Sequence, residues 1–151
     1  MIKKGLALDS SVLVKWFKRG EEFEKEALKL RRDVLSSAIN VLVSEVAELE
    51  VCRALVKAGY ASDKVDEAHA ILKEMSELGF LKTFPVAVMR EEAKDLIAKL
   101  NLYVADAISL ATAIVNSSDL LTEDMHLLKL EVKEFMKDRG LKVIRLKELY
   151  R

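Results

Sequence analysis

Short apolar segments alternate along the chain with longer segments in which apolar residues recur at helical spacing. The apolar segments predict strands at residues 6–8, 39–43, 80–84, 120–122 and 142–146. The longer segments predict helices at residues 22–35, 45–58, 62–79, 86–99, 104–115 and 125–137. Because the strands are apolar throughout, both faces of the sheet should be covered. The expected fold is therefore a three-layer α/β/α domain with a short, mainly parallel central sheet.

Length and composition narrow the organisation and the classes of site. The chain has 151 residues, of which 51% are hydrophobic, without a linker or repeat, so we expect one domain over 1–151. Lys+Arg and Asp+Glu both number 25, so any nucleic-acid site should be local. Cys52 is the single cysteine, which excludes an internal disulfide and a cysteine-rich zinc site, and we expect it in the core. The apolar segment at 6–8 is too short for a signal peptide or membrane span, so a cytoplasmic location is expected.

Acidic residues follow two of the predicted strands directly. Asp9 comes after the first strand, and Asp124 comes after the strand at 120–122. Parallel sheets bind ligands at the carboxyl ends of their strands, which makes these two residues candidates for a site. Either aspartate could instead serve only to cap the segment that follows it.

Two further acids lie on predicted helices. Asp106 is in the first turn of the very apolar helix at 104–115, where the helix dipole favours an acid and partial burial is expected. A buried carboxylate is costly unless it is paired or bound to a cation. Glu50 has mostly apolar neighbours at helical spacing, although it could simply pair with Arg53. Spacing favours Glu50 only mildly over Glu45 and Glu48.

Four short motifs resemble those of PIN-domain proteins, especially toxins of the VapC family. They are LDSSVLVKW at 8–16, SEVAELEV with Ala54-Leu55 at 44–55, ADA with Leu110-Ala111 at 105–111, and LTED at 121–124. They occur in the family's order and span most of the chain, and they place Asp9, Glu50, Asp106 and Asp124 at the family's acidic positions. The chain departs from the pattern at Met125, where a basic residue is common, at Leu127, where an aromatic is common, and at Arg53, where asparagine is common.

The resemblance implies an endoribonuclease that depends on Mg²⁺ or Mn²⁺. Such cations prefer oxygen ligands. Asp9 and Asp106 would hold one ion, Glu50 would hold it or orient a water, and Asp124 would support a second ion. Ser10 and Thr122 would hydrogen-bond the carboxylates or the phosphate, or would only cap the local backbone. The implied partners are an RNA substrate, a VapB-type antitoxin and a second or further copies of the chain.

Basic residues near the motifs are candidates for binding the phosphate backbone, although most such residues are simply solvated. They are Lys15, Lys18, Arg19, Arg53 and Lys57. The aromatic residues Trp16 and Phe17 are expected in the core or at an interface.

Three alternatives to a toxin-type ribonuclease stay open. A PIN nuclease could process RNA without an antitoxin, and a PIN-like scaffold could lack catalysis, although the presence of all four acids argues against the scaffold. A phosphoacceptor signalling domain shares the same class of fold. It requires an acidic cluster at the first strand and an acceptor aspartate after a middle strand, whereas Asp9 has no acidic neighbour and the second strand is followed by Ser44.

Overall fold

The computed structural model describes residues 5–151, which are built around a five-stranded sheet in the order β3-β2-β1-β4-β5. All four neighbouring strand pairs are parallel. The strands are β1 (Leu6–Leu8), β2 (Val41–Ser44), β3 (Leu81–Phe84), β4 (Asp119–Leu121) and β5 (Val143–Ile144). The predicted three-layer fold with a parallel central sheet is confirmed, and its strands are short and mostly buried, as their uniform apolar character predicts.

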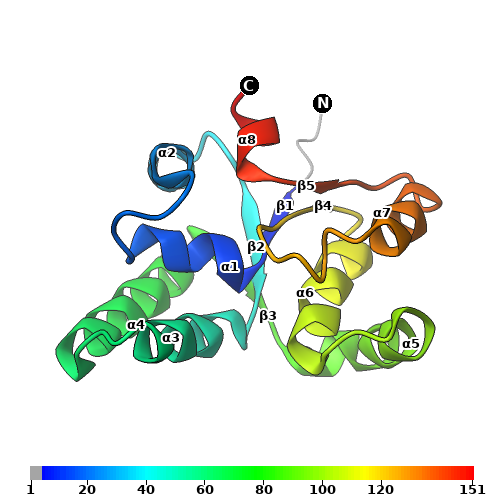
Figure 1. Cartoon of the computed structure of the whole chain (residues 1–151), viewed down its shortest axis with the longest axis horizontal. Helices are drawn as coiled ribbons and strands as arrows, with labels where there is room; N and C mark the ends of the chain where they lie inside the picture. The colour runs from blue at the N-terminus through cyan, green and yellow to red at the C-terminus, as the bar shows by residue number, and fades with distance from the viewer. Residues whose placement is uncertain (1–4) are drawn as a thin grey trace.

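Helices cover both faces of the sheet (Figure 1). On one side lie α1 (Ser10–Leu13), the 3₁₀ turn η1 (Val14–Trp16), α2 (Glu24–Leu35), α3 (Ala47–Lys57) and α4 (Ser62–Glu77). On the other side lie α5 (Arg90–Leu100), which follows the 3₁₀ turn η2 (Val86–Met89), α6 (Val104–Val115) and α7 (Leu130–Lys137). The short α8 (Leu146–Leu149) ends the chain near α2.

Each face of the sheet has its own apolar core. Alternate residues of β1 point to opposite faces, so Leu6 and Leu8 pack with α1 to α4, whereas Ala7 packs with α5 to α7. The central part of α6 is buried along its length from Asp106 to Ala113, as its composition predicts. This helix therefore carries Asp106 into the interior beside the sheet.

The helix predicted at 125–137 and the strand predicted at 142–146 are markedly shorter in the structure. Residues 125–129 form turns, not helix, because the Asp124 carbonyl accepts from the backbone N–H of Leu127 and Leu128 and its carboxylate accepts from the N–H of His126. The expected last strand at 142–146 is reduced to β5, and Leu146 already begins α8. Cys52, predicted in the core, is only partly buried.

Within residues 5–151, no single helix is long and apolar enough to cross a membrane. The one helix pair with sufficient combined length and apolar character, Val86–Leu100 with Val104–Val115, is bent by 119°.

Candidate functional site

The sheet order places β1 at the point where the chain changes direction across the sheet. β1 pairs with β2 on one side and with β4 on the other. Ligands of open parallel sheets bind at such a switch point, beyond the carboxyl ends of the strands. Asp9 follows β1 and Asp124 follows β4, so both predicted acids lie at this edge. The backbone N–H of Asp9 donates to the Leu121 carbonyl at 3.0 Å, which joins the two strand ends.

Three hydrogen bonds hold the buried Asp9 carboxylate in place. Ser109 Oγ donates to Oδ1 at 2.7 Å, while Thr122 Oγ1 and the Ser11 backbone N–H each donate to Oδ2 at 3.2 Å. These donors come from α6, from the segment after β4 and from α1. Asp9 therefore caps α1, as the alternative reading of the sequence proposed, and it also anchors three separate elements in one place.

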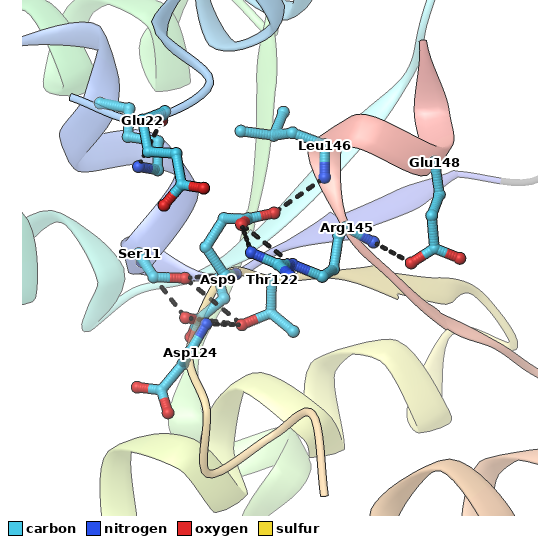
Figure 2. A network of polar contacts seen from close by, with 10 residues as sticks. Asp9, Ser11, Glu22, Thr122, Asp124, Arg145, Leu146 and Glu148 are labelled. Atoms are coloured by element: carbon cyan, nitrogen blue, oxygen red, sulfur yellow. Dashed lines mark hydrogen bonds and ion pairs between the residues drawn. The ribbon is translucent and has the colours of Figure 1, made fainter. Parts of the chain in front are cut away.

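Ser11 and Thr122 extend this network towards Asp124 (Figure 2). Their hydroxyl oxygens lie 3.3 Å apart. Thr122 Oγ1 accepts from the Asp124 backbone N–H and Ser11 Oγ accepts from the Glu123 N–H, both at 3.0 Å. These bonds fix the backbone of the Thr122–Asp124 segment relative to Asp9.

Glu123 holds the C-terminal segment against the same loop. Its Oε1 accepts from Arg145 Nε at 3.1 Å and Nη2 at 2.7 Å, and its Oε2 accepts from the Leu146 backbone N–H at 2.9 Å. Figure 2 shows Arg145 and Leu146 in the same view as Asp9 and Thr122, with Glu148 accepting from the Arg145 backbone N–H. The contact has a supporting role because both oxygens of the Glu123 carboxylate accept hydrogen bonds from within the chain.

The remaining predicted acids are electrostatically coupled to Asp9. Burial, followed by the negative charges of Asp9 and Asp106, raises the pKa of Glu50 from 4.5 to about 7, while a Ser10 hydroxyl hydrogen bond acts in the opposite direction. Burial, followed by the charges of Asp124 and Asp9, raises the pKa of Asp106 from 3.8 to about 6. The fold thus gathers four acids from four distant segments into one region of negative potential.

The four acids have the oxygen ligands that a divalent cation requires, but their carboxylates lie too far apart to hold one. Glu50 Oε1 is buried without a hydrogen-bond partner, which is costly unless a cation or another donor reaches it. Among residues 5–151, none of the four acids forms an ion pair with lysine or arginine. However, no three Asp, Glu, His or Cys side chains of the described chain converge closely enough to hold a metal as they stand. Binding would require the carboxylates to rotate towards one another.

The predicted supporting residues and the candidate phosphate-binding residues have different surroundings in the structure. Ser10 and Thr122 lie in the carboxylate network, whereas Lys15 is buried and donates to the Glu22 carbonyl at 2.8 Å, which makes it a structural residue rather than a phosphate ligand. Lys18 is paired with Glu21. Arg53 and Lys57 are exposed on α3, so they stay candidates.

The aromatic pair that precedes Arg19 lines a hollow formed by η1, α2, α3 and α4. Its volume is about 370 Å³, and Trp16, Phe17 and Arg19 all border it. Trp16 is buried in the core, as predicted, and Phe17 packs against the same core. Arg19 therefore faces this hollow and is not part of the carboxylate network.

Ser11 and Ser109 were not among the predicted site residues. Ser109 follows Asp106 by one helical turn, so its position on the same face of α6 is a usable signal. The hydrogen bond from Ser109 to Asp9 could not be predicted from the sequence, because the two residues are 100 positions apart in the chain. The Ser11 backbone N–H donates locally to Asp9, as expected for a serine at the start of a helix, but its hydroxyl accepts from the Glu123 N–H, which is 112 residues away in the chain.

Solved structures with the same fold include a toxin and a toxin–antitoxin complex. A toxin–antitoxin complex from Klebsiella pneumoniae matches with a TM-score of 0.62 and 17% identity over 94% of this chain and 98% of that one. The Mycobacterium tuberculosis toxin VapC20, described as cleaving the sarcin-ricin loop, matches with a TM-score of 0.64 and 17% identity over 80% and 91% of the two chains. The protein PAE2754 from Pyrobaculum aerophilum matches with a TM-score of 0.61 and 18% identity over 97% and 92%.

A comparison with curated proteins found no match. The family model described as PIN domain matches residues 6–133, which include all four acids and every strand except β5. The motif resemblance seen in the sequence, the parallel α/β/α architecture and the family match agree with one another. The chain belongs to the PIN domain family.

Proposed function

We propose that this protein is a metal-dependent endoribonuclease, with Asp9, Glu50, Asp106 and Asp124 as its catalytic and metal-binding acids. One observation supports the proposal: in a PIN domain family member, these acids surround the switch point of the sheet closely enough that burial and mutual repulsion raise the pKa of Glu50 to about 7. A cluster of like charges that opposes its own ionisation is a favourable environment for a divalent cation. We extend the domain to the whole chain, because β5 and α8 add to the same sheet and core.

Mg²⁺ or Mn²⁺ suits the donor set, which consists of carboxylate oxygens. Asp9 and Asp106 would hold the ion, Glu50 would complete the site, and Asp124 would support a second ion. When bound, the cation supplies positive charge at the phosphate oxygens and makes a water easier to deprotonate.

The chain's own residues would divide the remaining tasks. Asp9 is held by its three hydrogen bonds and would give the site a fixed reference point. Glu50 would orient the water whose oxygen attacks phosphorus and would accept its proton as the bond to the leaving sugar oxygen breaks. Ser10 would orient Glu50, and Thr122 would hold Asp9 and the Asp124 backbone in fixed positions relative to each other.

Cleavage of a mixed RNA pool, structured and single-stranded, tests the proposal. Purified protein should cut RNA with Mg²⁺ or Mn²⁺, should stop in EDTA, and should lose activity as Asp106→Asn. Glu74→Gln is the matched control, because Glu74 is an exposed acid on α4 outside the network. A folded, partner-free protein that neither cuts RNA nor binds either metal would refute the enzyme and support the scaffold alternative.

We further propose that the ribonuclease is the toxin of a toxin–antitoxin pair, inhibited by a VapB-type antitoxin, and that it forms a homodimer or a higher homo-oligomer. The support is the fold likeness to a toxin–antitoxin complex and to VapC20, together with the hollow beside Trp16 and Phe17, which offers apolar surface to a partner. Expression of the chain alone should arrest bacterial growth through its RNA cleavage, and Asp106→Asn should relieve the arrest. RNA cleavage without growth arrest would favour an RNA-processing nuclease. Light scattering on the purified chain tests the oligomeric state.

A further inference from the structure

Two aromatic rings lie exposed at the rim of the acidic cluster. Tyr103 is the N-cap residue of α6, one helical turn before Asp106, and 70% of its surface is exposed. His126 lies in the loop after β4, where its backbone N–H donates to Asp124 Oδ1 at 2.7 Å. The ring centroids are 5.3 Å apart and the ring planes meet at 83°, an edge-to-face contact. The rings are therefore attached to the two elements that carry Asp106 and Asp124.

Apolar side chains flank both rings in the chain. Val104 follows Tyr103 and is 64% exposed, and Met125 precedes His126 and is 72% exposed. Single exposed apolar residues are ordinary on protein surfaces. Here two of them and two rings occur together beside buried carboxylates. Neither ring packs into either apolar core of the described chain. Their exposure is thus not explained by the stability of the fold.

The charge of the neighbouring site restricts what this surface can bind. The acids repel the phosphates of RNA as long as no cation is present, and the acids themselves have no lysine or arginine partner within residues 5–151. A nucleobase is uncharged and offers a flat π face. Proteins hold single-stranded nucleic acid by stacking such faces on aromatic side chains.

We propose that Tyr103 and His126, with Val104 and Met125 beside them, form a platform that stacks a base of single-stranded RNA next to the phosphate bound at the acidic cluster. The proposal rests on the proposed ribonuclease function and adds a contact that selects unpaired RNA. The edge-to-face contact orders both rings before RNA arrives, so little side-chain freedom is lost on binding. Bases within a duplex are already stacked and would not be available to the platform.

Binding without cleavage separates base stacking from contacts to the backbone. Short, fluorescein-labelled single-stranded RNA of mixed sequence is titrated with the native protein, Tyr103→Ala, Tyr103→Phe and Leu78→Ala in Ca²⁺, which binds oxygen ligands and screens the acids in place of the proposed catalytic Mg²⁺ or Mn²⁺. The same titrations use an abasic ribose-phosphate oligomer of equal length. Leu78 is the matched control: it is also apolar and exposed, but it ends α4 before β3, at the opposite edge of the sheet.

Tyr103→Ala should raise the Kd for RNA by about 5- to 150-fold, the range for loss of one stacked base. The slope of log Kd against the logarithm of the salt concentration should not change, because no charge is removed. Tyr103→Phe and Leu78→Ala should bind RNA like the native protein, and all variants should bind the abasic oligomer equally.

Three results would overturn the platform. Unchanged RNA binding by Tyr103→Ala would rule out the platform without contradicting the proposed ribonuclease function, provided that the native protein binds and cuts RNA. An equal loss of affinity for RNA and for the abasic oligomer would mean that Tyr103 acts on the backbone or on the fold. A change in oligomeric state with unchanged RNA affinity per chain would assign the surface to a contact between copies. Failure of the native protein to bind or cut any RNA would instead refute the proposed function itself.

Discussion

Replacing Glu50 with glutamine should make the metal-free protein more stable at neutral pH, although it removes a proposed catalytic group. The folded protein raises the pKa of Glu50 from 4.5 to about 7, through burial and then the charges of Asp9 and Asp106. The folded state therefore holds this proton more tightly than the unfolded state does. The stability that this tighter proton binding contributes is fully present below about pH 4.5 and is lost as the pH rises to about 7.

The size of the effect follows from the change in pKa. A pKa difference of one corresponds to about 1.4 kcal/mol, so the change at Glu50 sets a ceiling of about 3 kcal/mol. Water still reaches part of the side chain and screens its charge, so about 1 to 2 kcal/mol is a realistic loss. For a chain of this length, that loss corresponds to about 2 to 8 °C in melting temperature. Glu50→Gln cannot ionise and avoids this loss.

Thermal melts in EDTA at a series of pH values measure the difference. From about pH 5 to about pH 8, the native protein should lose stability relative to Glu50→Gln, whereas the control Glu74→Gln should follow the native curve. Mn²⁺ should then stabilise the native protein at neutral pH more than it stabilises Glu50→Gln, because a ligand that binds only the folded state adds to its stability. Parallel curves for the native protein and Glu50→Gln over this range would refute the coupling of the carboxylates.

Other substitutions test the supporting contacts. Asp9→Asn should lower RNA cleavage by about 100-fold or more with the fold retained, measured from initial rates; an active Asp9→Asn would exclude Asp9 as a metal ligand. Ser109→Ala should leave Asp9 Oδ1 without its 2.7 Å donor and weaken Mn²⁺ affinity by about 10-fold, measured by calorimetry; native affinity would mean that the other two bonds suffice. Glu123→Gln should cost about 1 to 3 kcal/mol in urea unfolding, because it weakens the two hydrogen bonds from Arg145 to Glu123 Oε1; an unchanged midpoint would contradict the role given to that contact.

The parts of the fold that sequence could predict are those governed by local pattern. The uniform apolar character of residues 6–8 and 120–121 reports burial on both faces of a sheet, and both segments are buried strands. The turns at 125–129 were misread because Leu127 and Leu128 mimic helical spacing. In the structure, Leu127 lies in a turn and its side chain is buried. The carbonyl and the carboxylate of Asp124 stabilise this turn by accepting backbone hydrogen bonds.

The candidate site divides in the same way. Asp9 and Asp124 were found from their positions after strands, which is a topological rule that needs no distances. Glu50 was only mildly favoured by spacing, because its environment depends on acids contributed by distant segments. The role of Ser109 towards Asp9, like the spacing of the acids, depends on three-dimensional packing that no local pattern encodes.

Manganese bound in a crystal tests the central claim most directly. Crystals soaked in Mn²⁺ at neutral pH, with data collected to show its anomalous signal, should contain a peak in direct contact with Asp9 and Asp106. Glu50 should turn towards the same peak, which would satisfy its buried Oε1. Crystals of Asp106→Asn soaked in the same way should lack the peak. A fully soaked native crystal with no manganese among these carboxylates, or with manganese bound equally in Asp106→Asn, would contradict the account.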